Sequence, residues 1–328
     1  MIGTNVGSFV GRGFVIDGRL RLEERLGEGA VGEVWRAMDL ELGSHVAVKR
    51  LAPRLQRCES RENHVASFFR EAALARRVDC PHSVRVMECA SSPDLGPYIV
   101  MEMLDGLDLF EHLARSGTLE IAETAAIVAQ LCLALDALHA ADVFHRDVKP
   151  ENVVMTTRLG RPCATLIDFS IAREGSSASE ELEEGIFGTP AYLSPERLSG
   201  SSPGRAQADL WALAVLAYQC LVGKVPFDDK SVATICVAVN RGTFTPPSAF
   251  VAHVSPGLDA WFRRAFARAP SDRFASATEM REALIDAWSP FPLQPSSSIG
   301  ETASRAAGRT SGVRGRLANR GASGREVA

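Results

Sequence analysis

His145-Arg146-Asp147-Val148-Lys149-Pro150-Glu151-Asn152 is the stretch that decides the fold, together with Asp168-Phe169, which begins sixteen positions after Asn152. The spacing predicts two neighbouring loops that carry three oxygen-bearing side chains, Asp147, Asn152 and Asp168, with Lys149 among them. Transfer of a phosphoryl group needs a carboxylate that accepts the proton of the attacking hydroxyl, hard oxygen ligands for a divalent cation, and positive charge beside the moving phosphate. The stretch therefore predicts a metal-assisted phosphoryl-transfer site.

The composition of the chain is that of a soluble globular enzyme. Its 328 residues can bury one large core or two lobes, and 46% are hydrophobic and 23% charged. The net charge of −4 predicts no nucleic-acid partner. Seven scattered cysteines, none in a C-x-x-C pair, favour reduced thiols in a cytoplasm over a disulfide framework or a zinc site.

The sequence predicts neither a targeting signal nor a membrane segment. Met1 to Arg12 lacks the basic start and apolar block of a signal peptide. The longest apolar run, Leu210 to Val222, has thirteen residues, whereas a membrane helix needs about 20. We therefore expect a soluble, cytoplasmic protein.

Residue periodicity predicts an α+β fold with two lobes. Strand-like runs at 20–26, 33–39, 45–51, 84–89 and 98–103, with an amphipathic helix at 62–77, predict a β-rich lobe over residues 20–103. Helical patterns at 121–140, 209–222, 231–240, 258–268 and 276–288 predict a mostly helical lobe over residues 104–289. The crossover near Met103 to Gly106 predicts a cleft, a common place for a ligand.

The two ends of the chain are predicted to lie outside these lobes. Residues 1–19 are expected to form an N-terminal extension. Residues 290–328 are rich in Ser, Gly, Ala and Arg without an apolar period, so they cannot offset their ordering entropy and are expected to be disordered. This basic tail fits either a solubilising segment or a docking segment for an acidic partner.

A glycine-rich run, Gly27-Glu28-Gly29-Ala30-Val31-Gly32-Glu33-Val34, lies between the first two predicted strands. Dinucleotide-binding turns use the same G-x-G-x-x-G letters but open a helix, whereas this run enters a strand. Its backbone can therefore close over phosphates with amide hydrogens pointing at them. Lys49 follows inside a predicted strand, where its ammonium needs a partner. If Lys49 is considered without the glycine-rich run, the alternative interpretation is a lysine on an edge strand whose ammonium contacts solvent.

These motifs, in this order from about Leu20 to Trp288, resemble a bacterial, eukaryotic-like (Hanks-type) serine/threonine protein kinase. The resemblance implies a bilobal protein-kinase-like fold, with a small β-rich N-lobe that has one main helix and a larger, mostly helical C-lobe. It implies transfer of the γ-phosphate of ATP, with Mg²⁺ or Mn²⁺, to Ser and Thr hydroxyls of proteins, including the chain itself in trans. Lys149, two residues after Asp147, is typical of the Ser/Thr class.

The resemblance also assigns roles to single residues. Asp147 is implied to be the base, Lys149 to steady the γ-phosphate, and Asn152 and Asp168 to hold the metal. Lys49 is implied to bind the α and β phosphates and to pair with Glu71 in a helix, with Glu62 the weaker candidate. Backbone groups of Glu102 and Leu104 are implied to bind the base. The full set implied to surround the nucleotide is Leu26, Gly27, Glu28, Gly29, Ala30, Val31, Gly32, Val34, Ala47, Lys49, Met101, Glu102, Leu104 and Asp108.

The segment from Asp168 to Glu196 resembles a kinase activation segment, to which Arg146 is implied to bind through a phosphate. Its phosphoacceptor candidates are Ser176, Ser177 and Ser179, while Thr189 is implied to position the substrate. An acidic run (Glu180, Glu181, Glu183 and Glu184) fits either a substitute for phosphate or a solvated loop. Three further residues are implied to be structural: Glu196 with its partner Arg273, and Asp209, which braces the catalytic loop.

The chain departs from the family pattern at three positions: Ser170 and Ala214 replace glycines, and Ser194 replaces an alanine. Ser170 follows the metal-binding aspartate, so we expect altered loop switching more than loss of activity. A pseudokinase that acts as an ATP-binding scaffold is the alternative. A small-molecule phosphotransferase is disfavoured because GTPAYLSPE and PSDRF predict a platform for protein substrates.

Overall fold

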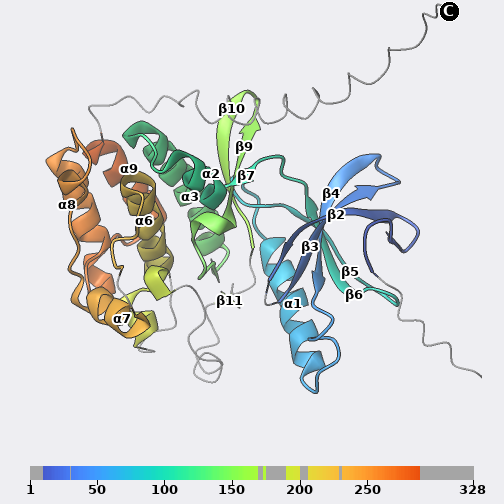
Figure 1. Cartoon of the computed structure of the whole chain (residues 1–328). Coiled ribbons are helices and arrows are strands. Elements are labelled where there is room, and N and C mark those ends of the chain that lie inside the picture. The colour runs from blue at the N-terminus through green and yellow to red at the C-terminus, as the bar shows by residue number, and fades with distance from the viewer. Residues whose placement is uncertain are drawn as a thin grey trace, which may run out of the picture.

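A computed structural model describes residues 10–29, 31–168, 173–174, 190–199, 206–228 and 231–288 of the chain. Figure 1 shows a twisted sheet with one helix beside it, and next to them a larger body made mostly of helices. This arrangement confirms the predicted fold: an antiparallel N-terminal sheet with one helix, followed by a mostly helical part.

The N-lobe is built on a six-stranded antiparallel sheet in the order β1-β2-β3-β4-β6-β5. Period-two alternation divides its side chains between two cores. On β6, Tyr98 and Val100 belong to a cluster on one face, while Ile99 faces the core that includes Phe68 of the helix α1. The elements of the lobe are β1 (Val15–Ile16), β2 (Leu20–Glu28), β3 (Gly32–Asp39), β4 (Ser44–Leu51), α1 (Arg61–Ala75), β5 (Val86–Ser92) and β6 (Gly96–Glu102).

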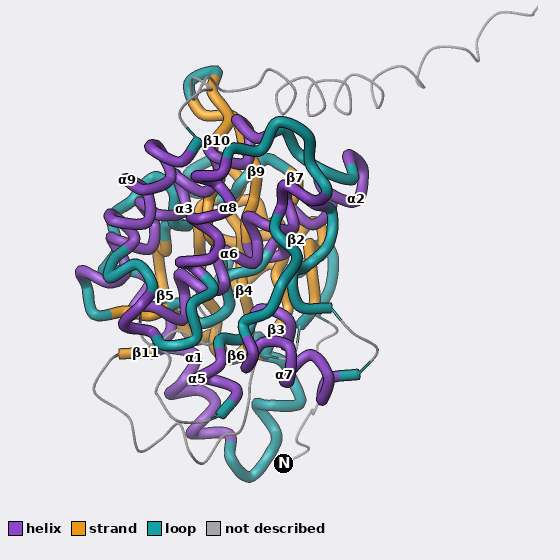
Figure 2. The backbone as a smooth tube through the Cα atoms, turned by 90° about the vertical axis from the view of Figure 1, so that its left-hand side faces the viewer, coloured by secondary structure: helices purple, strands orange, loops and turns teal. Residues whose placement is uncertain are grey.

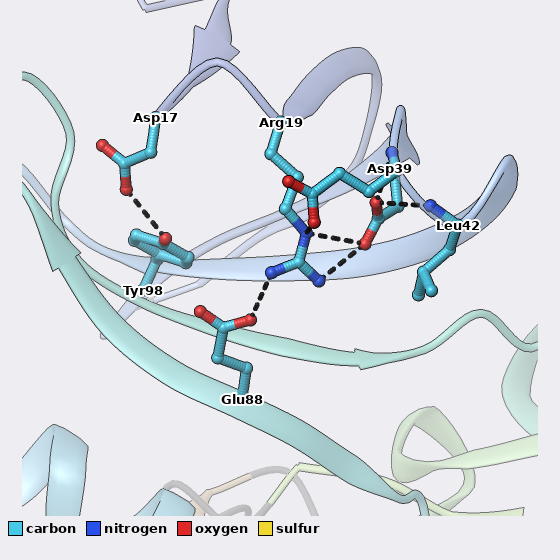
Figure 3. A network of polar contacts seen from close by, with 7 residues as sticks. Asp17, Arg19, Asp39, Leu42, Glu88 and Tyr98 are labelled. Carbon is cyan, nitrogen blue, oxygen red and sulfur yellow. Dashed lines mark hydrogen bonds and ion pairs between the residues drawn. The ribbon is translucent and has the colours of Figure 1, made fainter.

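Residues 10–19, which the sequence predicted as part of an extension, instead include β1 and so form part of this sheet. Arg19 donates to Asp39 Oδ2 at 2.7 and 3.0 Å and to Glu88 at 2.7 Å, and Tyr98 donates to Asp17 at 3.0 Å (Figure 3). Asp39 also accepts from the backbone of the turn between β3 and β4. The network therefore ties three separate parts of the lobe together.

The C-lobe is organised around two apolar helices, α3 and α6. By length and composition α3 could cross a membrane, but it packs against α6, α9 and β10, as the core helix of a folded lobe does. Figure 2, seen from the side of these helices, shows them in front of the strands. The helices are α2 (Leu109–Ser116), α3 (Ile121–Ala140), α5 (Pro195–Leu198), α6 (Ala206–Val222), α7 (Val232–Arg241), α8 (Pro256–Ala265) and α9 (Ala277–Ala287).

Short strands of the C-lobe carry the loops of the predicted site. They are β7 (Leu107–Asp108), β8 (Val143–Phe144), β9 (Val153–Arg158), β10 (Arg161–Leu166) and β11 (Arg173–Glu174). The sequence did not predict α2 or the hairpin of β9 and β10. The hairpin separates the two loops of the site, because Asn152 precedes β9 and Asp168 follows β10.

Backbone contacts join the two lobes beside this hairpin. The amide of Leu166 donates to the carbonyl of His82 at 2.8 Å, and the amide of Val84 donates to the carbonyl of Leu166 at 2.9 Å. Arg158 in β9 pairs with Glu102 in β6 at 3.0 Å. The end of β10 is thus anchored to the N-lobe two residues before Asp168.

Gly32 allows a close approach between β3 and β4. A Cβ at this position would lie 2.1 Å from the carbonyl oxygen of Arg50, whereas a Cβ at Gly27 would meet nothing within 4 Å. Gly32→Ala is therefore expected to lower the free energy of unfolding by ~1–3 kcal/mol, because the backbones of β3 and β4 must move apart to make room for the methyl group. Gly27→Ala should change it by less than about 1 kcal/mol. Denaturant unfolding of both variants checks the prediction, which fails if the two changes are equal.

Candidate active site

The catalytic loop predicted at residues 145–152 is held from beneath by Asp209, a buried residue of α6. Its carboxylate accepts hydrogen bonds from the amides of His145 (2.9 Å) and Arg146 (2.7 Å) and lies 2.9 Å from Nε2 of His139. Burial acts to raise the pKa of Asp209, but the hydrogen bond and charge of His139 outweigh it and hold that pKa below its usual range. Asp209 thus supports Arg146 in a left-handed backbone conformation, with φ of +66°.

Asp147 is oriented by its neighbours in the same loop. Nδ2 of Asn152 donates both to the carbonyl oxygen and to Oδ2 of Asp147, each at 2.8 Å. Nζ of Lys149 lies 2.8 Å from the same Oδ2. These contacts gather the predicted base, the predicted phosphate-binding lysine and one predicted metal ligand into a single cluster.

Lys49 and Asp168 bring the two lobes together next to this cluster, because the amide of Ile167, the residue before Asp168, donates to the carbonyl of Asn152 at 2.8 Å. Nζ of Lys49, in β4 of the N-lobe, lies 2.7 Å from Oδ1 of Asp168, which follows β10 of the C-lobe. The Lys49 side chain is only 8% exposed, so its ammonium is stabilised by the carboxylate rather than by solvent. The backbone of Asp168 has a φ of +65°, a left-handed conformation that is unfavourable for residues other than glycine.

The donor atoms present suit a hard divalent cation. Because Nδ2 of Asn152 is used on Asp147, its Oδ1 is the atom left for a cation, and Asp168 supplies a carboxylate. Within the described part of the chain, no group of three His, Cys, Asp or Glu side chains could hold a metal. Mg²⁺ commonly binds through one or two carboxylates together with waters and substrate phosphates, so a site with few protein ligands fits it.

The residues predicted around the nucleotide lie on β2, β3, β4 and β6 and in the connection to α2. Leu26 is 47% exposed, while Ala47 is buried. The amide of Gly29 donates to the carbonyl of Gly32 at 2.8 Å, which closes the tip of the glycine-rich hairpin. Met101, near the end of β6, and Leu104, in the linker between the lobes, pack against the core.

Two predicted nucleotide-contacting residues also have structural partners. Asp108 is the N-cap of α2, where its Oδ1 accepts from the amide of Glu111 at 2.7 Å. The amide of Glu102 donates to the carbonyl of Arg85 at 3.0 Å, and its carboxylate binds Arg158. Their roles toward a base or a ribose remain predictions.

Several predicted site residues lie outside the described part of the chain. Glu71 belongs to α1, but its side chain is not described, so its pairing with Lys49 remains a prediction. The others outside the described residues are Ala30, Ser170, Ser176, Ser177, Ser179, Thr189, the acidic run at 180–184 and the tail at 290–328.

Glu196 and Arg273 form a buried, two-pronged ion pair between α5 and the turn before α9. Nη1 and Nη2 of Arg273 each donate to one carboxylate oxygen of Glu196 at 2.8 Å, and Nε donates to the carbonyl of Ala267 at 2.7 Å. The guanidinium also lies over Trp211, 4.8 Å from the ring centroid. Burial acts to raise the pKa of Glu196, but the Arg273 hydrogen bonds and charge outweigh it and lower that pKa.

The structure adds two residues that the sequence interpretation missed. His139, at the end of α3, contacts Asp209, and Nη1 of Arg197 in α5 donates to the carbonyl of Arg146 at 2.5 Å. Both contacts support the backbone of the catalytic loop from other elements. Neither role could be recognised from the neighbouring sequence, because the partner of each residue lies more than fifty positions away in the chain.

Comparison with known proteins agrees with this geometry. Residues 20–288 match the protein kinase domain. Serine/threonine-protein kinase Pkn1 of Myxococcus xanthus is 36% identical over 270 residues, which cover 81% of this chain and 38% of that protein. Serine/threonine-protein kinase PknB of Mycobacterium tuberculosis is 34% identical over 272 residues, 81% of this chain and 42% of that protein. The chain thus spans less than half the length of these two relatives.

Proposed function

The chain belongs to the protein kinase family, and from that premise we propose that it is an active serine/threonine protein kinase. The observation that carries the proposal is the 2.7 Å contact of Lys49 with Asp168 beside the cluster of Asp147, Lys149 and Asn152. Residues from both lobes thereby meet at one end of the predicted nucleotide cleft. Bacterial relatives named as serine/threonine kinases support the same assignment.

In the proposed reaction each of these residues acts on ATP, on the cation or on the acceptor hydroxyl. ATP lies under the glycine-rich hairpin, whose amides and Lys49 hold its phosphates. Asp147 orients the acceptor hydroxyl and accepts its proton, and Lys149 offsets charge on the transferred phosphate. Asn152 and Asp168 would hold Mg²⁺ or Mn²⁺, and the cation would supply positive charge beside the transferred phosphate.

We propose that the acceptors are Ser and Thr hydroxyls of proteins, including those of a second copy of the chain. We also propose a cytoplasmic location.

The test is incubation of the full chain with labelled ATP and Mg²⁺, followed by identification of the phosphorylated amino acids. Labelled serine or threonine in the wild type, absent in Asp147→Asn, supports the proposal. ATP binding without any label transfer favours a pseudokinase instead.

Asp168→Asn is expected to weaken metal use specifically. An amide is a poorer ligand than a carboxylate for a hard cation, and the variant also loses the ion pair with Lys49. The Mg²⁺ concentration for half-maximal transfer should rise at least ~10-fold. A Mg²⁺ titration at saturating ATP checks this. An unchanged Mg²⁺ requirement would remove Asp168 from the metal site.

A further inference from the structure

Cys163, in β10, lies against the loop between α1 and β5, in the turn that carries Cys80 and His82. Sγ of Cys163, in β10, lies 3.6 Å from Nδ1 of His82 and 3.8 Å from the carbonyl oxygen of Pro81. Cys80 precedes Pro81 in the same turn, which the amide of Ser83 closes by donating to the Cys80 carbonyl at 3.1 Å. Both thiols are free, and Cys80 is half-buried whereas Cys163 is 5% exposed.

The backbone around these side chains is held on both sides. Gln130 of α3 accepts from the amide of Ala164 at 2.7 Å and donates to the carbonyl of Pro162 at 3.1 Å. On the other side, Nδ1 of His82 lies 2.9 Å from the carbonyl oxygen of Ala164. Cys163 is therefore kept against the Cys80 turn rather than free to swing away.

Polar and basic side chains act on the Cys163 thiol. Burial acts to raise its pKa, but the hydrogen bond and charge of His82, with Thr165 and Arg158, outweigh it and lower that pKa. Burial raises the pKa of Cys80, with Asp79 and Cys163 acting in the same direction. In the core, burial raises the pKa values of Cys132 and Cys220. The surroundings thus lower the pKa of the Cys163 thiol and raise that of Cys80.

We propose that Cys163 is a peroxide-reactive thiol and that Cys80 resolves its oxidised form into a reversible disulfide between β10 and the α1–β5 loop. The Cys163 thiolate attacks one oxygen of hydrogen peroxide, the O–O bond breaks, and the leaving hydroxide takes a proton to become water. The Cys80 thiol then gives up its proton and attacks the sulfenic sulfur of Cys163, the S–O bond breaks, and the leaving hydroxide takes that proton to become the second water. In sum, two thiols are oxidised and one peroxide is reduced to two waters.

The disulfide adds a covalent link at the junction of the lobes. The same loop is already joined to β10 by the hydrogen bonds of His82 and Val84 with Leu166. The inference stands on these contacts and does not depend on the proposed kinase activity. Its test therefore reads the thiols directly.

The experiment treats the reduced full chain with hydrogen peroxide, blocks the remaining thiols with N-ethylmaleimide, and maps peptides by mass spectrometry without reduction. The expected product is a Cys80–Cys163 linked peptide that dithiothreitol removes. In Cys80→Ser, dimedone should label Cys163 as the trapped sulfenic acid. Cys236→Ser, which removes a partly buried thiol of α7, is the matched control and should still form the link.

A second measurement tests the role of His82. In His82→Gln the alkylation rate of Cys163 by iodoacetamide at neutral pH should fall at least ~3-fold, with its pH profile displaced upward. The proposal is overturned if dimedone labels other cysteines but not Cys163, or if Cys80 forms no link to it. An unchanged alkylation profile in His82→Gln also overturns it. Labelling of the wild type alone remains decisive if a cysteine variant does not fold.

Discussion

Asp147→Asn is expected to lower the rate of phosphoryl transfer about 10²–10⁴-fold, the usual contribution of a positioned general base. The amide keeps the size of the carboxylate but cannot accept the hydroxyl proton. It also loses the charge that faces Nζ of Lys149 at 2.8 Å. Initial rates with labelled ATP at saturating Mg²⁺ measure the effect, and nucleotide affinity should change little because Asp147 acts on the acceptor hydroxyl.

Glu282→Gln is the matched control, since it neutralises an exposed carboxylate on α9 of the same lobe. It should transfer phosphate at the wild-type rate. A variant Asp147→Asn that retains transfer within a few-fold of wild type would show that proton acceptance lies elsewhere. A loss of nucleotide binding in parallel would instead indicate damage to the cleft.

Arg273→Met is expected to lower the free energy of unfolding by about 3–5 kcal/mol, because it leaves the Glu196 carboxylate buried without its partner. The arginine also donates to the carbonyls of Ala267 and Arg268, which lose those hydrogen bonds. Denaturant unfolding at neutral pH measures the loss. Arg115→Met, which removes an exposed pair with Glu111, should cost less than about 1 kcal/mol.

The effect of Arg273→Met depends on pH in a defined direction. In the wild type the pKa of Glu196 is lowered, so the pair contributes stability that is present at neutral pH and lost as pH falls through that lowered value. In the variant, burial without the guanidinium raises the pKa of Glu196. Its destabilisation should therefore shrink as the pH falls through the raised value, and a loss that is constant from neutral to acidic pH would contradict this account.

Local sequence patterns predicted many of the helices and strands. The helix expected at 121–140 is α3 with the same bounds, because a long apolar run has strong helical propensity and ends where the chain must turn. The strand-like run at 45–51 likewise predicted β4. The hairpin of β9 and β10 was missed since its residues lack a clear polar alternation, and both strands are largely buried.

Motif residues identified the chemistry before any coordinates, because the side chains that a phosphoryl-transfer site needs are themselves letters of the chain. Their partners depend on the tertiary structure. Lys49 contacts Asp168 across 119 positions and His139 contacts Asp209 across 70. The contact of His82 with Cys163 spans 81 positions and follows no sequence pattern. Residue order encodes propensities over a few neighbours, whereas ion pairs, burial and thiol ionisation depend on which distant segments folding brings within a few ångströms.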